Sequence, residues 1–160
     1  MMSHRPLGAP TLALAAALLV PACGGDNPAG LPDVFRSAIR VTVAPNPVPA
    51  VQSPITGSVS AGYAVTITEL AGLGGEVVFV SSTIFDPQTG FQVTVNYFDS
   101  DDLVVFVGSS RIDPGGTLEV PKTMNYALPD FRAQADLVVT VQFRDDRGNT
   151  INSSLLVKVV

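Results

Sequence analysis

The chain has 160 residues, which leaves room for one folded domain once a targeting segment is set aside. It is apolar for a soluble protein, low in charge and rich in Val, Thr, Ser, Gly and Pro, a composition that favours strands and turns over helices. The net charge of −5 is spread along the chain, so no basic patch exists to hold nucleic acid, and we expect no nucleic-acid partner.

Residues 1–22 have the layout of a secretory signal peptide. His4 and Arg5 give a polar, basic start, and the apolar run Leu12–Val20 is too short to span a bilayer. Val20-Pro21-Ala22-Cys23 follows it. This segment resembles a bacterial lipobox, although Pro21 departs from the residue usual there. The resemblance implies that Cys23 becomes the lipidated first residue of the mature protein. Ordinary signal cleavage after Ala22 is the alternative.

Residues 23–36 are expected to form a flexible tether. Gly24–Pro32 is rich in Gly and Pro and has no hydrophobic period, as suits a segment between a membrane and a domain. By resemblance to Gram-negative lipoproteins, Gly24 after the Cys carries no inner-membrane retention signal. Attachment to the outer membrane through the lipid anchor is therefore expected if the organism is Gram-negative.

From Ser37 onward the sequence predicts short strands separated by turns. Residues 39–43 alternate until Pro45, Pro47 and Pro49 interrupt pairing, which indicates an edge strand that stops or switches sheets. Further strands are predicted near 63–68, at Glu76–Ile84, which is apolar on both faces and so central, and at 91–97. In the last of these, Phe91, Val93, Val95 and Tyr97 are expected to face the core.

The second half of the domain continues this pattern. Asp86–Gly90, Asp99–Asp102 and Asp113–Gly116 are predicted turns, with strands at Leu103–Ser109 and Thr117–Val120. Residues 121–134 lack clear periodicity and are expected to form a long loop, with one helical turn near Pro129–Ala133.

The clearest element is the final hairpin. Leu137, Val139, Val141 and Phe143 share one face, and the period-2 pattern returns at Ile151, Leu155, Val157 and Val159. Asp145–Gly148 suits a type I turn that Gly148 closes in the left-handed conformation.

Residues 37–160 are thus predicted to form an all-β domain, an antiparallel two-sheet sandwich of about seven to eight strands. In layout it resembles the immunoglobulin-like and fibronectin-III-like sandwiches of bacterial surface proteins. The resemblance is strongest in the final hairpin and at Asp113–Leu118. The paired Cys and core Trp of antibody domains are absent, so no specific family is assigned.

We expect no enzyme, no cofactor and no metal site. After cleavage before Cys23 the mature chain has no His, which removes the usual base of a nucleophilic triad and the usual zinc or copper ligands. Ser81-Ser82 and Ser109-Ser110 are then strand or turn serines. Glu69, Glu76 and Glu119 are enough carboxylates for the catalytic pair of a glycosidase. These residues lie, however, where solvent-facing charge is expected.

Two kinds of binding site stay open. The acidic turns, Asp99/Asp101/Asp102 and Asp145/Asp146/Asn149, supply oxygen atoms for calcium, although Asp is also the commonest residue to start a turn. For a glycan, exposed aromatic residues are needed. Phe79, Phe91, Tyr97 and Phe143 are expected in the core, and Phe98, Phe106 and Tyr126 are the better candidates for exposure.

The function expected is that of a non-enzymatic cell-envelope lipoprotein, whose sandwich binds a protein or glycan partner or serves as a structural module. The alternative is a secreted inhibitor or chaperone-like accessory that presents apolar loops, with Leu70–Gly75 and Asn46–Val51 as the segments concerned. Apolar loop tips gathered at one end of the domain would favour binding.

Overall fold

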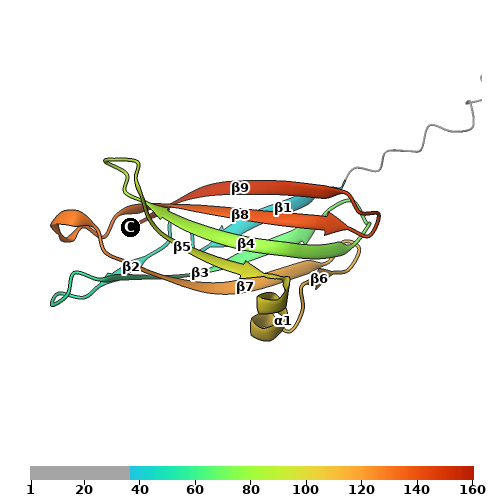
Figure 1. Cartoon of the computed structure of the whole chain (residues 1–160), viewed down its shortest axis with the longest axis horizontal. Coiled ribbons are helices and arrows are strands. Elements are labelled where there is room, and N and C mark those ends of the chain that lie inside the picture. The colour runs from blue at the N-terminus through green and yellow to red at the C-terminus, as the bar shows by residue number, and fades with distance from the viewer. Residues whose placement is uncertain (1–36) are drawn as a thin grey trace, which may run out of the picture. The chain divides into compact units, whose positions relative to one another are not determined.

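The structure, a computed structural model, describes residues 37–160, so the predicted signal peptide, the tether and Cys23 lie outside the described residues. The described part is an antiparallel two-sheet sandwich, as the sequence predicts (Figure 1). It has nine strands, two of them only two or three residues long, and one α-helix. These elements are β1 (Ile39–Ala44), β2 (Ala50–Gln52), β3 (Val59–Glu69), β4 (Gly75–Phe85), β5 (Gln92–Asp99), α1 (Ser100–Val107), β6 (Arg111–Ile112), β7 (Thr117–Tyr126), the 3₁₀ turn η1 (Pro129–Phe131), β8 (Ala135–Asp145) and β9 (Thr150–Val159).

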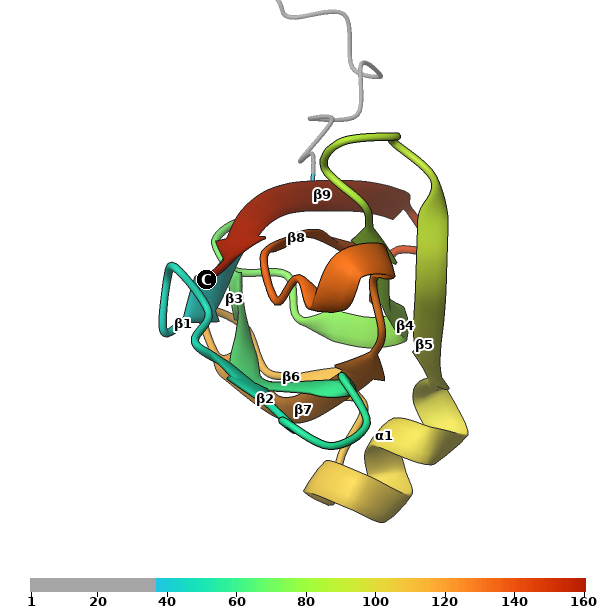
Figure 2. The same ribbon diagram turned by 90° about the vertical axis from the view of Figure 1, so that its left-hand side faces the viewer.

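Two sheets enclose the core. In the first, β3 lies between β7 on one side and the short β1 and β2 on the other. In the second, the order is β9-β8-β4, with β5 and β6 both on the far side of β4. This division of strands is that of an immunoglobulin-like sandwich. Figure 2 shows the two sheets curving around the interior when the domain is viewed along its strands.

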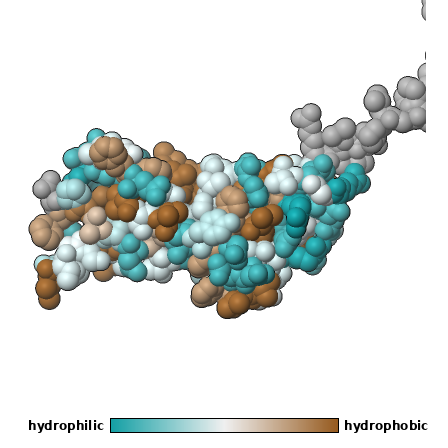
Figure 3. All heavy atoms as spheres, viewed as in Figure 1, coloured by the Kyte–Doolittle hydropathy of each residue, from teal (hydrophilic) through white to brown (hydrophobic). Residues whose placement is uncertain are grey.

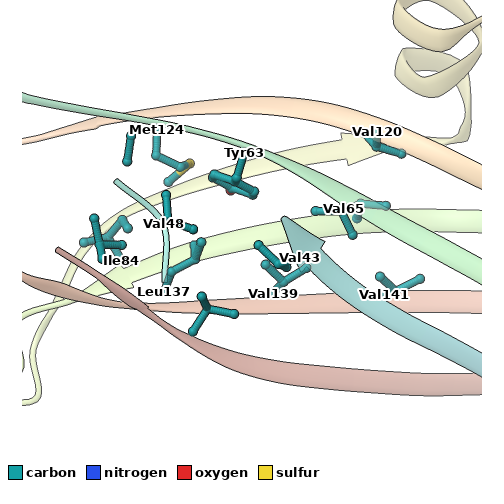
Figure 4. Packing of buried hydrophobic residues seen from close by; sticks show 14 of the residues in the cluster. Val43, Val48, Tyr63, Val65, Ile84, Val120, Met124, Leu137, Val139 and Val141 are labelled. Atoms are coloured by element: carbon teal, nitrogen blue, oxygen red, sulfur yellow. The ribbon is translucent and has the colours of Figure 1, made fainter. Parts of the chain in front are cut away.

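The core is built by the period-2 alternation of four long strands, β3 and β7 from one sheet and β4 and β8 from the other. Tyr63 and Val65 on β3 face Val139 and Val141 on β8, and all four are buried (Figure 4). Val141 and Phe143 are fully buried, as the hairpin pattern predicts. The predicted turn is also present, because Gly148 donates from its backbone N to the Asp145 O at 2.9 Å with φ at 87°.

The proline-rich segment after β1 changes sheets. Val48 donates its backbone N–H to the Lys158 O, and Val160 donates to the Val48 O, both at 2.9 Å, so this segment runs along the edge of β9. Val48 is completely buried. The sequence prediction of an edge strand that switches sheets is therefore confirmed.

The predicted strand at Leu103–Ser109 is wrong, because residues Ser100–Val107 form α1. The predicted turn Asp99–Asp102 is instead a capping box. The Asp99 carboxylate accepts from the backbone N of Asp102 at 2.9 Å, and Asp102 accepts from the Asp99 N at 3.3 Å. Gly108 ends the helix in the left-handed conformation. Apolar, β-branched residues dominate this run, but the caps at both ends decide its local structure.

The long loop predicted at 121–134 is shorter than expected. β7 continues to Tyr126 with strict alternation, and Pro121 is accommodated because β3 is the only strand that pairs with β7 among the described residues. The helical turn expected near Pro129–Ala133 is confirmed as η1. The Tyr126 hydroxyl donates to the Ala133 carbonyl and so holds the connection between β7 and β8 against the end of the sandwich.

The faces of β5 are reversed relative to the prediction from Val95 onward, while Val93 packs against the core as predicted. Val95 and Tyr97 are exposed, whereas Phe98 packs against the core. β5 lies at a sheet edge, and its register with β4 shifts between Ile84 and Phe85. The irregularity lies at Val93 and interrupts the alternation of faces along the strand.

No helix within residues 37–160 is long and apolar enough to cross a membrane.

Candidate binding surface at the loop end

Three loops place large apolar side chains in solvent at one end of the sandwich. Ile55 in the β2–β3 loop, Phe91 after the β4–β5 turn and Phe131 in η1 are 89%, 75% and 69% exposed. Figure 1 shows these loops at the end opposite the one where the described chain begins. Figure 3 shows hydrophobic surface at the same end. We refer to Ile55, Phe91 and Phe131, together with the nearby exposed Val51 and Val160, as the loop end.

The β2–β3 loop and η1 are packed together. Gln52 donates from Nε2 to the Phe131 carbonyl at 2.5 Å, and the Phe131 ring lies directly over Gly57. A Cβ atom on Gly57 would meet the ring at 2.3 Å, and the φ of Gly57 is 70°, so only glycine fits there. Phe131 itself has a φ of 53°, which is rare for a residue with a bulky side chain. Its exposed ring is therefore held in place by the loop opposite.

An ion pair connects η1 to the β4–β5 turn. Arg132 Nη1 lies 3.1 Å from Asp86 Oδ1, and the Asp86 side chain is almost fully buried. The backbone N–H of Gln88 and then Arg132 hold the pKa of the Asp86 carboxyl below its usual value. Asp86 also accepts from the Thr89 hydroxyl, so it caps the turn as the sequence predicts. All three loops of the loop end are thus cross-connected.

An open pocket lies beside the β4–β5 turn, on the outer face of the second sheet. Its volume is about 300 Å³, and Pro87, Val138 and Leu156 give it apolar walls. A neighbouring pocket of about 210 Å³ shares Pro87 and Asp136 and extends to Val160 at the chain terminus. The pockets extend the apolar surface from the loop end onto β8 and β9. This geometry suits binding of an apolar segment, because the charged residues of the walls are already paired, Asp86 with Arg132 and Asp136 with Lys158.

The opposite end of the domain is polar, and its two buried carboxylates, Asp145 and Glu69, have hydrogen-bond donors within the domain. Burial alone would raise the pKa of Asp145, but hydrogen bonds from the Ser37 hydroxyl and from Asn149 lower it to about 2. Burial of Glu69 likewise opposes ionisation. Backbone N–H groups of Gly115, Ala71 and Gly72 outweigh burial and lower the pKa of Glu69. Both carboxylates hold loops together.

These and two further contacts account for most of the acidic residues that the sequence singles out. Glu76 pairs with Arg144 at 2.6 Å, and Asp146 pairs with Arg111 at 2.8 Å. Glu119 lies exposed on β7, whereas the Glu69 side chain is buried. Asp99 and Asp102 cap α1. Within residues 37–160 no group of three or more His, Cys, Asp or Glu side chains is placed to hold a metal ion.

The expected distribution of aromatic residues is partly wrong. Phe143 is buried and Phe106 exposed, as predicted, but Phe91 and Tyr97 are exposed and Tyr126 is buried. Tyr126 extends the alternation of β7, which ends six residues later than predicted, and this places it inside.

The loops suspected in the alternative function do not form one surface. Val48, in the Asn46–Val51 segment, is buried against β9, and Val51 is the exposed large apolar residue of this segment. Leu70, at the start of the other loop, follows Glu69 at the opposite end of β3, and its backbone N–H is bonded to the Ala38 carbonyl. The two segments are separated by the length of the strand.

One polar group inside the sandwich was missed by the sequence reasoning. Lys122 on β7 points inward beside Tyr63 on β3, donates to the Val80 carbonyl at 3.1 Å and lies 4.1 Å from the centre of the Phe98 ring. Burial lowers the pKa of Lys122 to about 8, against the effect of the Asp102 carboxylate. The feature of the sequence that indicates this inward position is the period-2 alternation of residues 117–126, in which Lys122 shares a face with Val120 and Met124. Its contacts join β7, β4 and β5, and neither pocket described above is lined by it.

Serines considered as nucleophiles have ordinary positions. Ser82 is completely buried on β4, and Ser81 lies on the opposite face of the same strand. Ser109 accepts a hydrogen bond from the Arg111 N at 2.9 Å, which shapes the turn after α1.

Comparisons with known proteins show the fold alone. No protein-family model and no curated protein matches the chain. The solved structure of a structural-genomics target, SoR45, is similar over 75% of this chain and 84% of that chain, with 15% identity and a TM-score of 0.58. The putative ApaA protein from Bordetella pertussis is similar over 76% of this chain and 92% of that chain, with 15% identity and a TM-score of 0.53. This chain therefore shares its β-sandwich fold with proteins of very different sequence.

Proposed function

We propose that this protein is a non-enzymatic cell-envelope lipoprotein, anchored through Cys23, whose sandwich holds a protein partner at the loop end. The observation that carries the proposal is the exposure of Ile55, Phe91 and Phe131 on three cross-connected loops. Exposed apolar side chains gathered on rigid loops are typical of binding surfaces. Contact between these side chains and water is unfavourable, and a bound partner removes that contact.

The position of Ser37 supports a loop end that is free to bind. Ser37 bonds to Asp145 beside the β8–β9 turn, so the chain that precedes it joins the domain opposite the loop end. The outer membrane is the proposed location if the organism is Gram-negative.

A protein partner is favoured over a glycan by the chemistry of the side chains. Sugars are usually bound by Trp or Tyr platforms with hydrogen-bonding groups at their edges, and the chain has no Trp. The exposed tips are Ile and Phe. We expect a partner segment with apolar side chains that pack between the tips and extend into the pocket at Leu156.

The test uses the full chain in a Gram-negative envelope, with a photo-reactive amino acid at position 55 or, as the control, at position 70. Both side chains are exposed, at opposite ends of the domain. We expect discrete adducts from position 55 that disappear when Phe91→Asp is added, and no such adducts from position 70. Adducts that contain peptides of a second polypeptide, identified by mass spectrometry, indicate a protein partner, and adducts whose mass falls on muramidase treatment indicate a glycan. Equal labelling from both positions would contradict the proposal.

A further inference from the structure

A different surface, the free edge of β5, points to a second copy of this chain. β4 is the only strand that pairs with β5 among the described residues, so the backbone groups on the other side of β5 have no strand partner there. Unpaired edges of this kind recruit another strand unless charge, proline or a covering segment blocks them.

The other long edges of the described domain carry such blocks. β7 contains Pro121 and the exposed Glu119, and the β1–β2 edge is interrupted by three prolines. β9 is covered near its end by the backbone of residues 48–50. By contrast, residues 92–98 of β5 contain no proline and no charged side chain. β5 is thus a long edge of residues 37–160 that carries none of these protections between Gln92 and Phe98.

We propose that two copies pair antiparallel through β5, with a two-fold axis at Asn96, to form one continuous sheet. Directly opposed residues of an antiparallel pair share a face, so this register places Val95 of each copy opposite Tyr97 of the other. Both side chains are 53% exposed in the single chain. A β-branched residue opposite an aromatic one is a favourable cross-strand pair. Tyr97 is already positioned, because its ring lies 5.3 Å from that of Phe79.

The charge and polar groups of β5 agree with this register. The only charged residue of the strand is Asp99, three residues from the axis. The two copies of Asp99 would be about 20 Å apart along the strands, more than twice the screening length of about 8 Å at physiological salt. At the axis itself lies Asn96, which is uncharged, so this register brings no like charges together there.

The first test is disulfide trapping of the full chain in detergent. Opposed residues in an antiparallel pair have Cα atoms about 4.5–5.5 Å apart, within the range of a disulfide. The double variant Val95→Cys, Tyr97→Cys should therefore give a covalent dimer on mild oxidation. Each single variant should not, because its two thiols are offset by two residues. The wild type, which has only Cys23, gives the background. Equal trapping of single and double variants would overturn the register.

The second test measures mass in detergent by light scattering. The wild type should have the protein mass of two chains, and Val95→Lys, which places a charge on the free edge, that of one chain. Leu156→Lys is the matched control, since Leu156 is similarly exposed on the same sheet face but lies on β9. A monomeric wild type, a dimeric Val95→Lys variant or a monomeric Leu156→Lys variant would each overturn the proposal. The cysteine test remains decisive if Val95→Lys fails to fold.

Discussion

Replacing Val141 with Asp tests whether the inner face of β8 is the structural centre of the domain. Val141 is completely buried and lies between Val80 on β4 and Ser153 on β9. None of the hydrogen bonds or ion pairs described above reaches it, so an aspartate carboxylate there would lose water without gaining a donor. The backbone of β8 could keep its strand conformation in this variant. The loss in the free energy of unfolding would therefore come from the buried side chain alone.

The magnitude follows from two losses. Removing a fully buried Val side chain from the core costs about 1.5–3 kcal/mol. Burying a carboxylate without a partner adds several kcal/mol, or raises its pKa until it is neutral, which still leaves unpaired polar atoms at about 1–3 kcal/mol. Domains of this size have only about 5–15 kcal/mol of stability. The variant is therefore expected to be largely unfolded at neutral pH.

The control is Thr140→Asp, one residue away on the outer face. Thr140 is half-buried and bonds to the Ser154 hydroxyl at 2.9 Å, so its replacement should cost about 1 kcal/mol or less. Both variants are compared with residues 37–160 of the wild type by urea denaturation and circular dichroism. The wild type should give a β spectrum and a cooperative transition. Greater damage from Thr140→Asp than from Val141→Asp would refute the assignment of faces.

Two further predictions concern Asp145 and Cys23. The pKa of Asp145 is about 2 in the folded domain, below its usual value near 3.8, so its contribution to stability is present above pH 3.8 and is lost as the pH falls towards 2. Asp145→Asn should therefore be less stable than the wild type at pH 7, with the difference shrinking below pH 4, as measured by urea denaturation at each pH; a constant difference would contradict this. Cys23→Ser in the full chain should move the protein from the detergent phase to the aqueous phase on phase separation, and a wild type that is already aqueous would disprove lipidation.

Period-2 alternation predicted most strands because burial on one face selects apolar residues at every second position. It identified the final hairpin, whereas apolar residues on both faces indicated the central position of β4 and the three prolines indicated the sheet switch near Val48. It failed at Leu103–Ser109 because an apolar, β-branched run has no distinctive period, and the Asp99–Asp102 capping box was interpreted as a turn. It also failed on β5, where an irregular register at a sheet edge exchanged the expected faces.

What the sequence by itself determined is local: the alternating strands, the Asp–Gly turns and the all-β class, all of which depend on neighbours within a few residues. What only the tertiary structure decided is which distant residues meet. Ile55, Phe91 and Phe131 belong to separate loops, and only the stacking of the two sheets places those loops at one end. The same is true of Arg132 with Asp86, of Ser37 with Asp145 and of the free edge of β5, because strand order is set by packing between sheets and not by any local pattern.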